Sequence, residues 1–287
     1  MNCILSSKAI QMNQILKLKD PRYFQIFFLG SFLVFGLIAL DWKINSIVVT
    51  AIILSVLGTQ LIAIKKYKLS YQSILSAFIS GLGLILLLRA NEIGTYVLAG
   101  VLSIAPKFII KYKGKHIFNP VNFGIITTIL ITGDAWISPG QWGSTSLYLL
   151  GIGIFSWLVL TKVKQLINGL VFLGILFVLE TVYLNLHLEW PMDFVTHKFT
   201  SGSLLLFSFF MITDPRTTPN HFWIRGIWSA IIAGISFYLM EFQYISAAPF
   251  WVLFFISPLT PFIDSLNKSK TFNWTPLENS EHSEGKI

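Results

Sequence analysis

The chain has 287 residues, of which 54% are hydrophobic and only 12% are charged. Soluble domains carry about twice that fraction of charged residues, so the composition excludes an ordinary soluble domain and indicates a membrane protein. The net charge of +8 does not indicate a nucleic-acid-binding protein, because the basic residues are scattered between apolar runs, and a single cysteine, Cys3, excludes internal disulfides and iron–sulfur ligation.

The apolar runs predict an all-α fold with about ten transmembrane helices, since one crossing takes roughly 20 residues. The predicted helices are 23–40, 44–64, 73–89, 94–110, 120–133, 144–161, 166–186, 199–213, 224–241 and 247–264. Residues 1–22 then form an N-terminal segment, 23–264 one transmembrane domain, and 265–287 a C-terminal tail. No small-residue cleavage site follows the first run, so we expect no cleaved signal peptide.

The basic residues fall mainly in alternate gaps between these helices. One side holds Lys8, Lys17, Lys19, Arg22, Lys65, Lys66, Lys68, Lys107, Lys111, Lys113, Lys115, Lys162, Lys164, Arg216, Arg225, Lys268, Lys270 and Lys286, and the other holds Lys43, Arg89 and Lys198. The positive-inside rule therefore predicts that both termini are cytoplasmic. The alternative, a soluble bundle of buried helices, does not predict this asymmetry.

Five helices that begin inside and five that begin outside indicate two inverted repeats. A Ser-Gly pair occurs in the third helix of each half, as Ser80-Gly81 and Ser201-Gly202. The predicted helices 120–133 and 199–213 are short, and each adjoins a polar motif that contains proline. Short or broken helices at corresponding places in two halves are typical of a binding site near the middle of the membrane.

The first polar motif runs from Lys113 to Gly124 and includes His116, Phe118, Asn119, Pro120 and Asn122. Asn119 suits the N-cap and Pro120 the first turn of the following helix. The positive end of that helix, together with the His and Asn side chains, favours an anionic or carbonyl-bearing ligand. The alternative is an ordinary capped helix whose basic neighbours contact lipid phosphates.

The second polar motif runs from Phe209 to Asn220 and includes Thr213, Asp214 and Arg216. Asp214 precedes a proline, which predicts that the helix ends there. One interpretation is that Thr213 and Asp214 close a cavity from the cytoplasmic side. The other is a simple Asp214–Arg216 pair in an exposed loop, worth about 0 to 1 kcal/mol.

Taken together, these motifs resemble the family of the RnfD and NqrB membrane subunits. The resemblance rests on His-Ile-Phe-Asn-Pro, Ser201-Gly202 and Phe-Phe-Met-Ile-Thr-Asp-Pro-Arg-Thr-Thr, and extends from Asp20-Pro21-Arg22-Tyr23 to the Pro258–Asp264 segment. It implies a bacterial inner-membrane subunit of an ion-translocating NADH:ferredoxin or NADH:quinone oxidoreductase complex, with a core site formed by Ser80, Gly81, His116 to Asn122, and Ser201 through Arg216. Other membrane subunits would be its partners, besides the lipid bilayer.

The family's covalent FMN is attached to a Thr in a Ser-x-Ala-Thr segment of a long outer loop. In this chain the corresponding loop is only about Gly133 to Gly143, and it contains no such segment. Thr145 is the nearest hydroxyl but lacks the surrounding pattern. The chain thus resembles the short RnfD-like and UnbU-like members, and the resemblance implies either non-covalent FMN or riboflavin, or no flavin.

A few charged and aromatic residues within or beside the predicted helices remain to be interpreted. We expect Arg89 to extend outward to the headgroups, or else to contact a ligand, and Lys107 to reach the inner surface. Glu180 either serves a proton or cation path or lies at the interface. Trp136, Trp142, Trp190, Trp223, Trp228 and Trp251 are expected in an interfacial belt. His187, His197, His221 and His282 lack metal-ligand spacing, so we assign no metal.

Two other functions are compatible with this pattern. Inverted five-helix repeats also serve channels and carriers for small solutes, and a membrane scaffold or biosynthetic accessory protein needs no transport of its own. A catalytic role is left open, and any redox role would be that of an electron-relay subunit.

Overall fold

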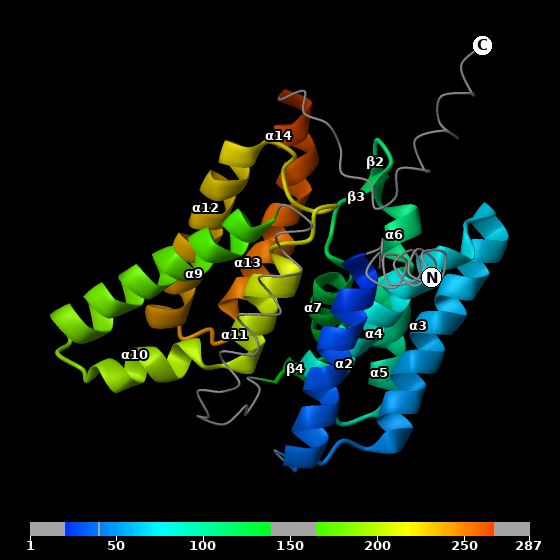
Figure 1. Cartoon of the computed structure of the whole chain (residues 1–287), viewed down its shortest axis with the longest axis horizontal. Coiled ribbons are helices and arrows are strands. Elements are labelled where there is room, and N and C mark those ends of the chain that lie inside the picture. Colours follow the sequence, from blue (N-terminus) through cyan, green and yellow to red (C-terminus); the bar gives the residue numbers. More distant parts are fainter. Residues whose placement is uncertain (1–20, 40, 139–164, 267–287) are drawn as a thin grey trace, which may run out of the picture.

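In a computed structural model, the structure describes residues 21–39, 41–138 and 165–266, most of which are helical (Figure 1). The first part comprises α2 (Pro21–Ala39), α3 (Ser46–Tyr67), α4 (Ile74–Leu87), α5 (Ile93–Ile104), α6 (Pro106–Ile109) and α7 (Pro120–Thr132). The second comprises α9 (Leu166–Glu180), η2 (Thr181–His187), α10 (Met192–Phe199), α11 (Gly202–Leu206), η3 (Phe207–Met211), α12 (Phe222–Glu241), α13 (Ala248–Ile256), η4 (Ser257–Leu259) and α14 (Thr260–Leu266). One more turn, η1 (Tyr71–Ser73), precedes α4.

Four helical segments are long and apolar enough to cross a membrane, namely Ser46–Tyr67, Leu166–His187, Phe222–Glu241 and Ala248–Leu266. Shorter apolar helices are Arg22–Ile38, Tyr71–Leu87, Ile93–Ile109, Pro120–Thr132 and Gly202–Met211. Each of these overlaps one predicted crossing, which confirms the all-α membrane fold. The predicted helix 144–161, with Thr145 and Trp142, lies outside the described residues.

Two helices are short, as their flanking prolines and polar residues predict. α7 has 13 residues: the Asn119 side chain accepts a hydrogen bond from the backbone N–H of Asn122, and Pro120 takes the first turn. It ends at Gly133, whose φ of 62° suits a glycine. The second short helix, Gly202–Met211, starts later than the predicted residue 199 because Met192–Phe199 forms the separate helix α10.

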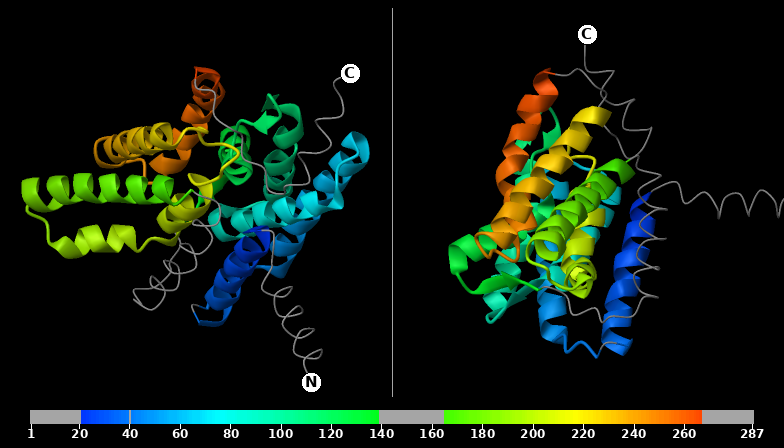
Figure 2. Two further views of the ribbon diagram at one scale, coloured as in Figure 1. Left: turned by 45° about the horizontal axis from the view of Figure 1, so that its top comes forward. Right: turned by 90° about the vertical axis from the view of Figure 1, so that its left-hand side faces the viewer.

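The helices of the two parts of the chain stand on two sides of the molecule, as Figure 1 and the left view of Figure 2 show. Their packing follows the same order. α3 packs against α4 and α5, as α9 packs against η3 and α12, and α5 packs against α7 as α12 packs against α13. This order agrees with two repeated halves, of which the described residues contain five predicted crossings in the first and four in the second. The two Ser-Gly pairs, however, do not correspond, because Ser80 lies in the middle of α4 whereas Ser201 precedes α11.

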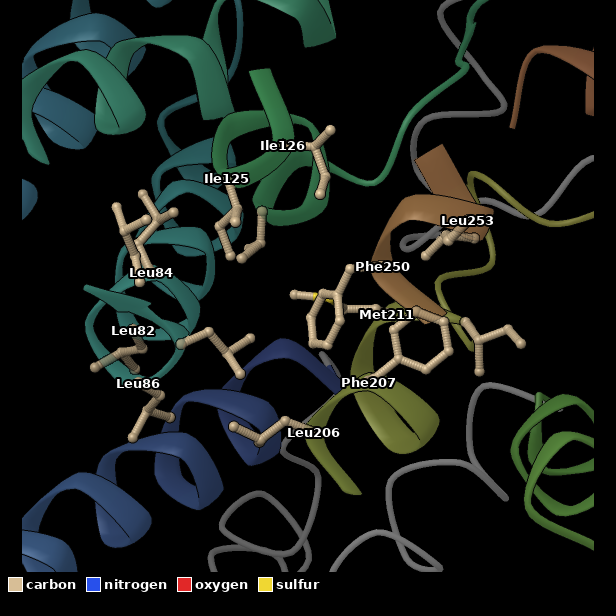
Figure 3. Packing of buried hydrophobic residues seen from close by; sticks show 14 of the residues in the cluster. Leu82, Leu84, Leu86, Ile125, Ile126, Leu206, Phe207, Met211, Phe250 and Leu253 are labelled. Atoms are coloured by element: carbon tan, nitrogen blue, oxygen red, sulfur yellow. The ribbon is translucent and has the colours of Figure 1, made fainter. Parts of the chain in front are cut away.

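A hydrophobic core joins the two halves at the centre of the molecule (Figure 3). Leu84 on α4 and Ile125 on α7 lie across from Phe207 on η3 and Phe250 on α13, and all four side chains are buried. The rings of Phe207 and Phe250 are 5.1 Å apart and tilted by 57°. The ring contact joins η3 to α13, and α13 in turn packs against α7, so the elements that carry the two polar motifs share this core.

Glycines allow close helix contacts at two places in this core. A Cβ added at Gly124 of α7 would lie 2.8 Å from the carbonyl oxygen of Ala99 on α5, and one at Gly169 of α9 would lie 2.6 Å from the carbonyl oxygen of Ser208 on η3. Any larger residue would push these helices apart. Small residues at such contacts are typical of helix packing in membranes.

Two short antiparallel pairs of strands mark opposite ends of the molecule. β2 (Lys111–Tyr112) pairs with β3 (Lys115–His116) near α14, whereas β1 (Leu88–Ala90) pairs with β4 (Ala135–Ile137) toward the end that holds α10 (Figure 1). Neither pair was predicted. Their strands are only two or three residues long, which is too short for an alternating pattern.

Candidate functional site

A cavity of about 480 Å³ lies between α2, α4, α6, the β2–β3 hairpin, the start of α7 and the loop after η3. We call it the basic cavity, because Arg22, Lys107, Lys111 and Arg216 line it together with one acidic residue, Asp214. Of the residues that were named individually for the core site, six line it, namely Ser80, His116, Asn119, Pro120, Asp214 and Arg216. Residues from both polar motifs therefore meet at one place.

The two polar motifs contact each other through Asp214. Its Oδ2 atom accepts a hydrogen bond of 3.4 Å from the Asn119 side-chain amide and lies 3.9 Å from Nε2 of His116. Its Oδ1 atom accepts a hydrogen bond from the backbone N–H of Arg216. The Asp214 side chain is therefore occupied on both oxygens, and the predicted Asp214–Arg216 contact is made to the backbone.

Burial and neighbouring charges shift the pKa values of Asp214 and His116. Burial tends to raise the pKa of the Asp214 carboxyl, but the neighbouring His116, the Arg216 N–H and the Lys107 charge outweigh it, so this pKa lies below the ordinary 3.8. Burial lowers the pKa of His116 below the ordinary 6.5, although Asp214 opposes the shift. At neutral pH the cavity thus presents an ionised carboxylate beside a neutral imidazole.

For Lys107 the position predicted from the sequence was wrong. It was expected to reach the inner surface, but only 8% of it is exposed, and it points into the basic cavity. Its Nζ atom donates hydrogen bonds of 3.3 Å to Ser76 Oγ and 3.2 Å to Ser80 Oγ. The reason is that α6 begins at Pro106, directly after α5, and turns the lysine toward α4.

The other predicted site residues do not line the basic cavity. Gly81 packs against α3, Phe118 stacks near Phe254 at 5.3 Å, and the Asn122 side chain donates to the carbonyl oxygen of Phe250. Thr213 donates to the carbonyl oxygen of Phe209, and Ser201 and Gly202 lie at the start of α11. Their observed roles are in packing and in ending or starting helices.

Sequence reasoning missed several polar residues of the cavity. Among them are Gln60, Gln72, Ser73 and Ser76 from α3, η1 and α4. Gln60 is almost completely buried within the apolar helix α3, and its side-chain amide donates to Ser73 Oγ at 2.9 Å. A lone glutamine inside a transmembrane run is the signal that could have identified this wall of the cavity.

Glu180 and Arg89 have local partners far from the basic cavity. Glu180 is fully buried, and its Oε2 atom lies 2.8 Å from Nζ of Lys198 on α10, which also pairs with Glu241 at the end of α12. The Arg89 guanidinium donates to the carbonyl oxygens of Ile85 and Leu88 at the end of α4. Arg89 thus caps the end of α4, and its contact with headgroups or with a ligand stays a prediction.

Only some of the tryptophans lie where an interfacial belt requires them. Trp136, Trp190 and Trp223 are exposed near helix ends, which fits the prediction. Trp228 contradicts it, since only 3% of this residue is exposed. It lies on the face of α12 that packs into the core, whereas Trp223, five residues earlier on the same helix, is 73% exposed.

Comparison with known proteins gives one family. The model of the NQR2, RnfD, RnfE family matches residues 121–273. The match starts one residue after Pro120 and contains the whole second polar motif. No curated protein matches the chain.

Proposed function

The chain belongs to the NQR2, RnfD, RnfE family, and from that premise we propose that it is a membrane subunit of an ion-translocating electron-transport complex in a bacterial inner membrane. Its partners would be further membrane subunits of that complex. Both termini would face the cytoplasm, because Lys65, Lys111 and Arg225 lie toward one end and Lys43 and Lys198 toward the other. The basic cavity would then open on the cytoplasmic side.

The observation that carries the proposal is the basic cavity itself. Its volume of about 480 Å³ falls in the range of small-molecule and cofactor sites, which runs from roughly 300 to 1,000 Å³. Apolar side chains such as Phe108 and Phe210 provide walls for a flat ring, and Gln60, Asn119 and Ser80 provide polar groups. This set of side chains fits a non-covalent flavin, FMN or riboflavin.

When bound, a flavin supplies one- and two-electron transfer within the membrane domain. The residues of this chain would bind and orient it. The hydrogen bond between Asn119 and Asp214 would fix the wall of the cavity where the two polar motifs meet, and the neutral imidazole of His116 would accept a proton there. The helices α2, α4 and α7 keep lipid away from the site.

The test is an absorbance spectrum of the full chain purified in detergent, recorded before and after acid precipitation. We expect a flavin spectrum that passes into the supernatant, because no Ser-x-Ala-Thr segment exists to hold it covalently. Flavin in the pellet would contradict the non-covalent site. A colourless protein that carries a solute into proteoliposomes without a reductant would contradict electron transfer and favour the channel or carrier function.

A further inference from the structure

One buried amine in the basic cavity, that of Lys107, forms no ion pair with any residue that the structure describes. Lys107 hydrogen-bonds only to the hydroxyls of Ser76 and Ser80, and within 21–138 and 165–266 no carboxylate forms an ion pair with it. A buried ammonium without an opposite charge is costly, because hydroxyls replace only part of its hydration. An anion in the cavity would remove much of that cost.

Three further basic residues come to the same cavity from separate elements. Arg22 stands on α2, Lys111 on β2, and Arg216 in the loop after η3. Arg22 is also buried, with 7% exposure, and its Nη1 atom donates to the carbonyl oxygen of Gln72. These cations come from three different elements and line one cavity from several sides. They therefore differ from a row of lysines on the surface.

The single acid of the cavity does not balance these charges. Asp214 already accepts hydrogen bonds from Asn119 and from the Arg216 backbone, and it faces His116. Among the described residues that line the cavity, four are basic and one is acidic, so these side chains favour an anion. The start of α7 at Asn119 and Pro120 adds the positive end of a helix dipole to the same wall.

From this arrangement we infer that the basic cavity binds a phosphate group, with Lys107 as its deepest contact and Arg22 and Arg216 beside it. A phosphate monoester carries close to two negative charges at neutral pH and offers three acceptor oxygens, which suits several cations better than a single carboxylate would. Its source is either a phosphorylated cofactor or an anionic lipid headgroup. The inference deepens the proposed function, since it concerns the same cavity and names the part of the ligand that the chain selects.

FMN and riboflavin are suitable probes, because they differ by one phosphate. We would titrate the full chain in detergent with each and follow quenching of flavin fluorescence. The expected result is that FMN binds on the order of tenfold more tightly or better, as charge-assisted hydrogen bonds to a phosphate imply. Lys107→Met should abolish this preference, because it weakens FMN binding more than riboflavin binding, whereas Lys107→Arg should keep it.

Lys65→Met is the matched control, since Lys65 is an exposed lysine at the end of α3 that does not line the cavity. It should leave the FMN preference intact. If Lys107→Met fails to elute as a folded particle in size-exclusion chromatography, Arg216→Gln takes its place. Equal affinity of the unaltered chain for FMN and riboflavin would overturn the phosphate inference while the proposed flavin site stands.

A second measurement tests whether the phosphate group belongs to a lipid. Native mass spectrometry would compare binding of phosphatidic acid with that of diacylglycerol, which lacks only the phosphate. If neither flavin binds but phosphatidic acid does, in a manner that depends on Lys107, the phosphate inference holds and the flavin proposal fails. If no phosphate-bearing probe binds better than its uncharged counterpart, the inference is wrong.

Discussion

Lys115 Nζ lies 2.9 Å from Asp264 Oδ2, and this ion pair joins the β2–β3 hairpin of the first half to α14 at the end of the second. Lys115 also donates to the carbonyl oxygen of Thr218 and to Asn220 Oδ1, while Asp264 Oδ1 accepts from the backbone N–H of Asn220. The cluster thus closes one end of the molecule beside the basic cavity.

We predict that Asp264→Asn lowers the stability of the purified protein by about 2 to 4 kcal/mol, because it leaves a largely buried ammonium without its counter-charge. Thermal unfolding in detergent would measure the change. Lys113→Gln, on the exposed turn of the same hairpin, should have little effect. Equal melting temperatures for Asp264→Asn and the unaltered chain would show that the pair does not hold the two halves together.

Gly169→Ala should destabilise the contact between α9 and η3. The added methyl group would lie 2.6 Å from the carbonyl oxygen of Ser208, and overpacking of this kind costs about 1 to 3 kcal/mol. Gly174→Ala on the same helix meets no atom within 4 Å and should be neutral or stabilising. The ratio of folded to aggregated protein after mild heating would compare the two variants, and similar losses in both would contradict the close contact.

The stability of the protein should fall as the pH drops below 6.5. The lowered pKa of His116 means that the unfolded chain binds a proton at a pH where the folded chain does not, so stability is full above 6.5 and is lost as the pH falls through the folded value. The lowered pKa of Asp214 acts in the same direction at lower pH, below 3.8.

Melting temperatures between pH 5 and 8 would test this. His116→Gln should reduce the decline between pH 6.5 and 5, because an amide does not titrate. His221→Gln, at an exposed position before α12, should keep it. An unchanged decline in His116→Gln would assign the pH dependence to other groups.

Lys198→Met should loosen α10 from the rest of the fold. It leaves the fully buried Glu180 and its neighbour Glu241 without the cation between them, and removal of one partner of a buried pair costs about 3 to 5 kcal/mol. Hydrogen exchange of residues 192–199 would report the loosening. Adding Glu180→Gln should restore part of the protection, and Lys43→Met, an exposed lysine of the loop before α3, should not alter it.

The helices were predictable because a segment that crosses lipid must be apolar and must satisfy its own backbone hydrogen bonds, and a helix does both. α10 was missed since its eight residues are amphipathic, and its Lys198 was counted as part of a loop. Asn119 and Asp214 were identified from residue types that end or start helices. The position of Lys107 in the cavity could not be predicted. It depends on how α6 turns toward Ser76 and Ser80 of α4, and packing between segments distant in the chain decides that turn.

The shortness of α7 and of Gly202–Met211 has an electrical consequence. At about 1.5 Å per residue, a helix of 10 residues such as Gly202–Met211 extends over only ~15 Å, roughly half of the ~30 Å hydrocarbon layer. Where the insulating layer is thin, the transmembrane voltage drops over a shorter path, and the local field is correspondingly stronger. A charge that crosses the protein beside these two helices would therefore do most of its electrical work over a path of ~15 Å, about half the thickness of the surrounding hydrocarbon layer.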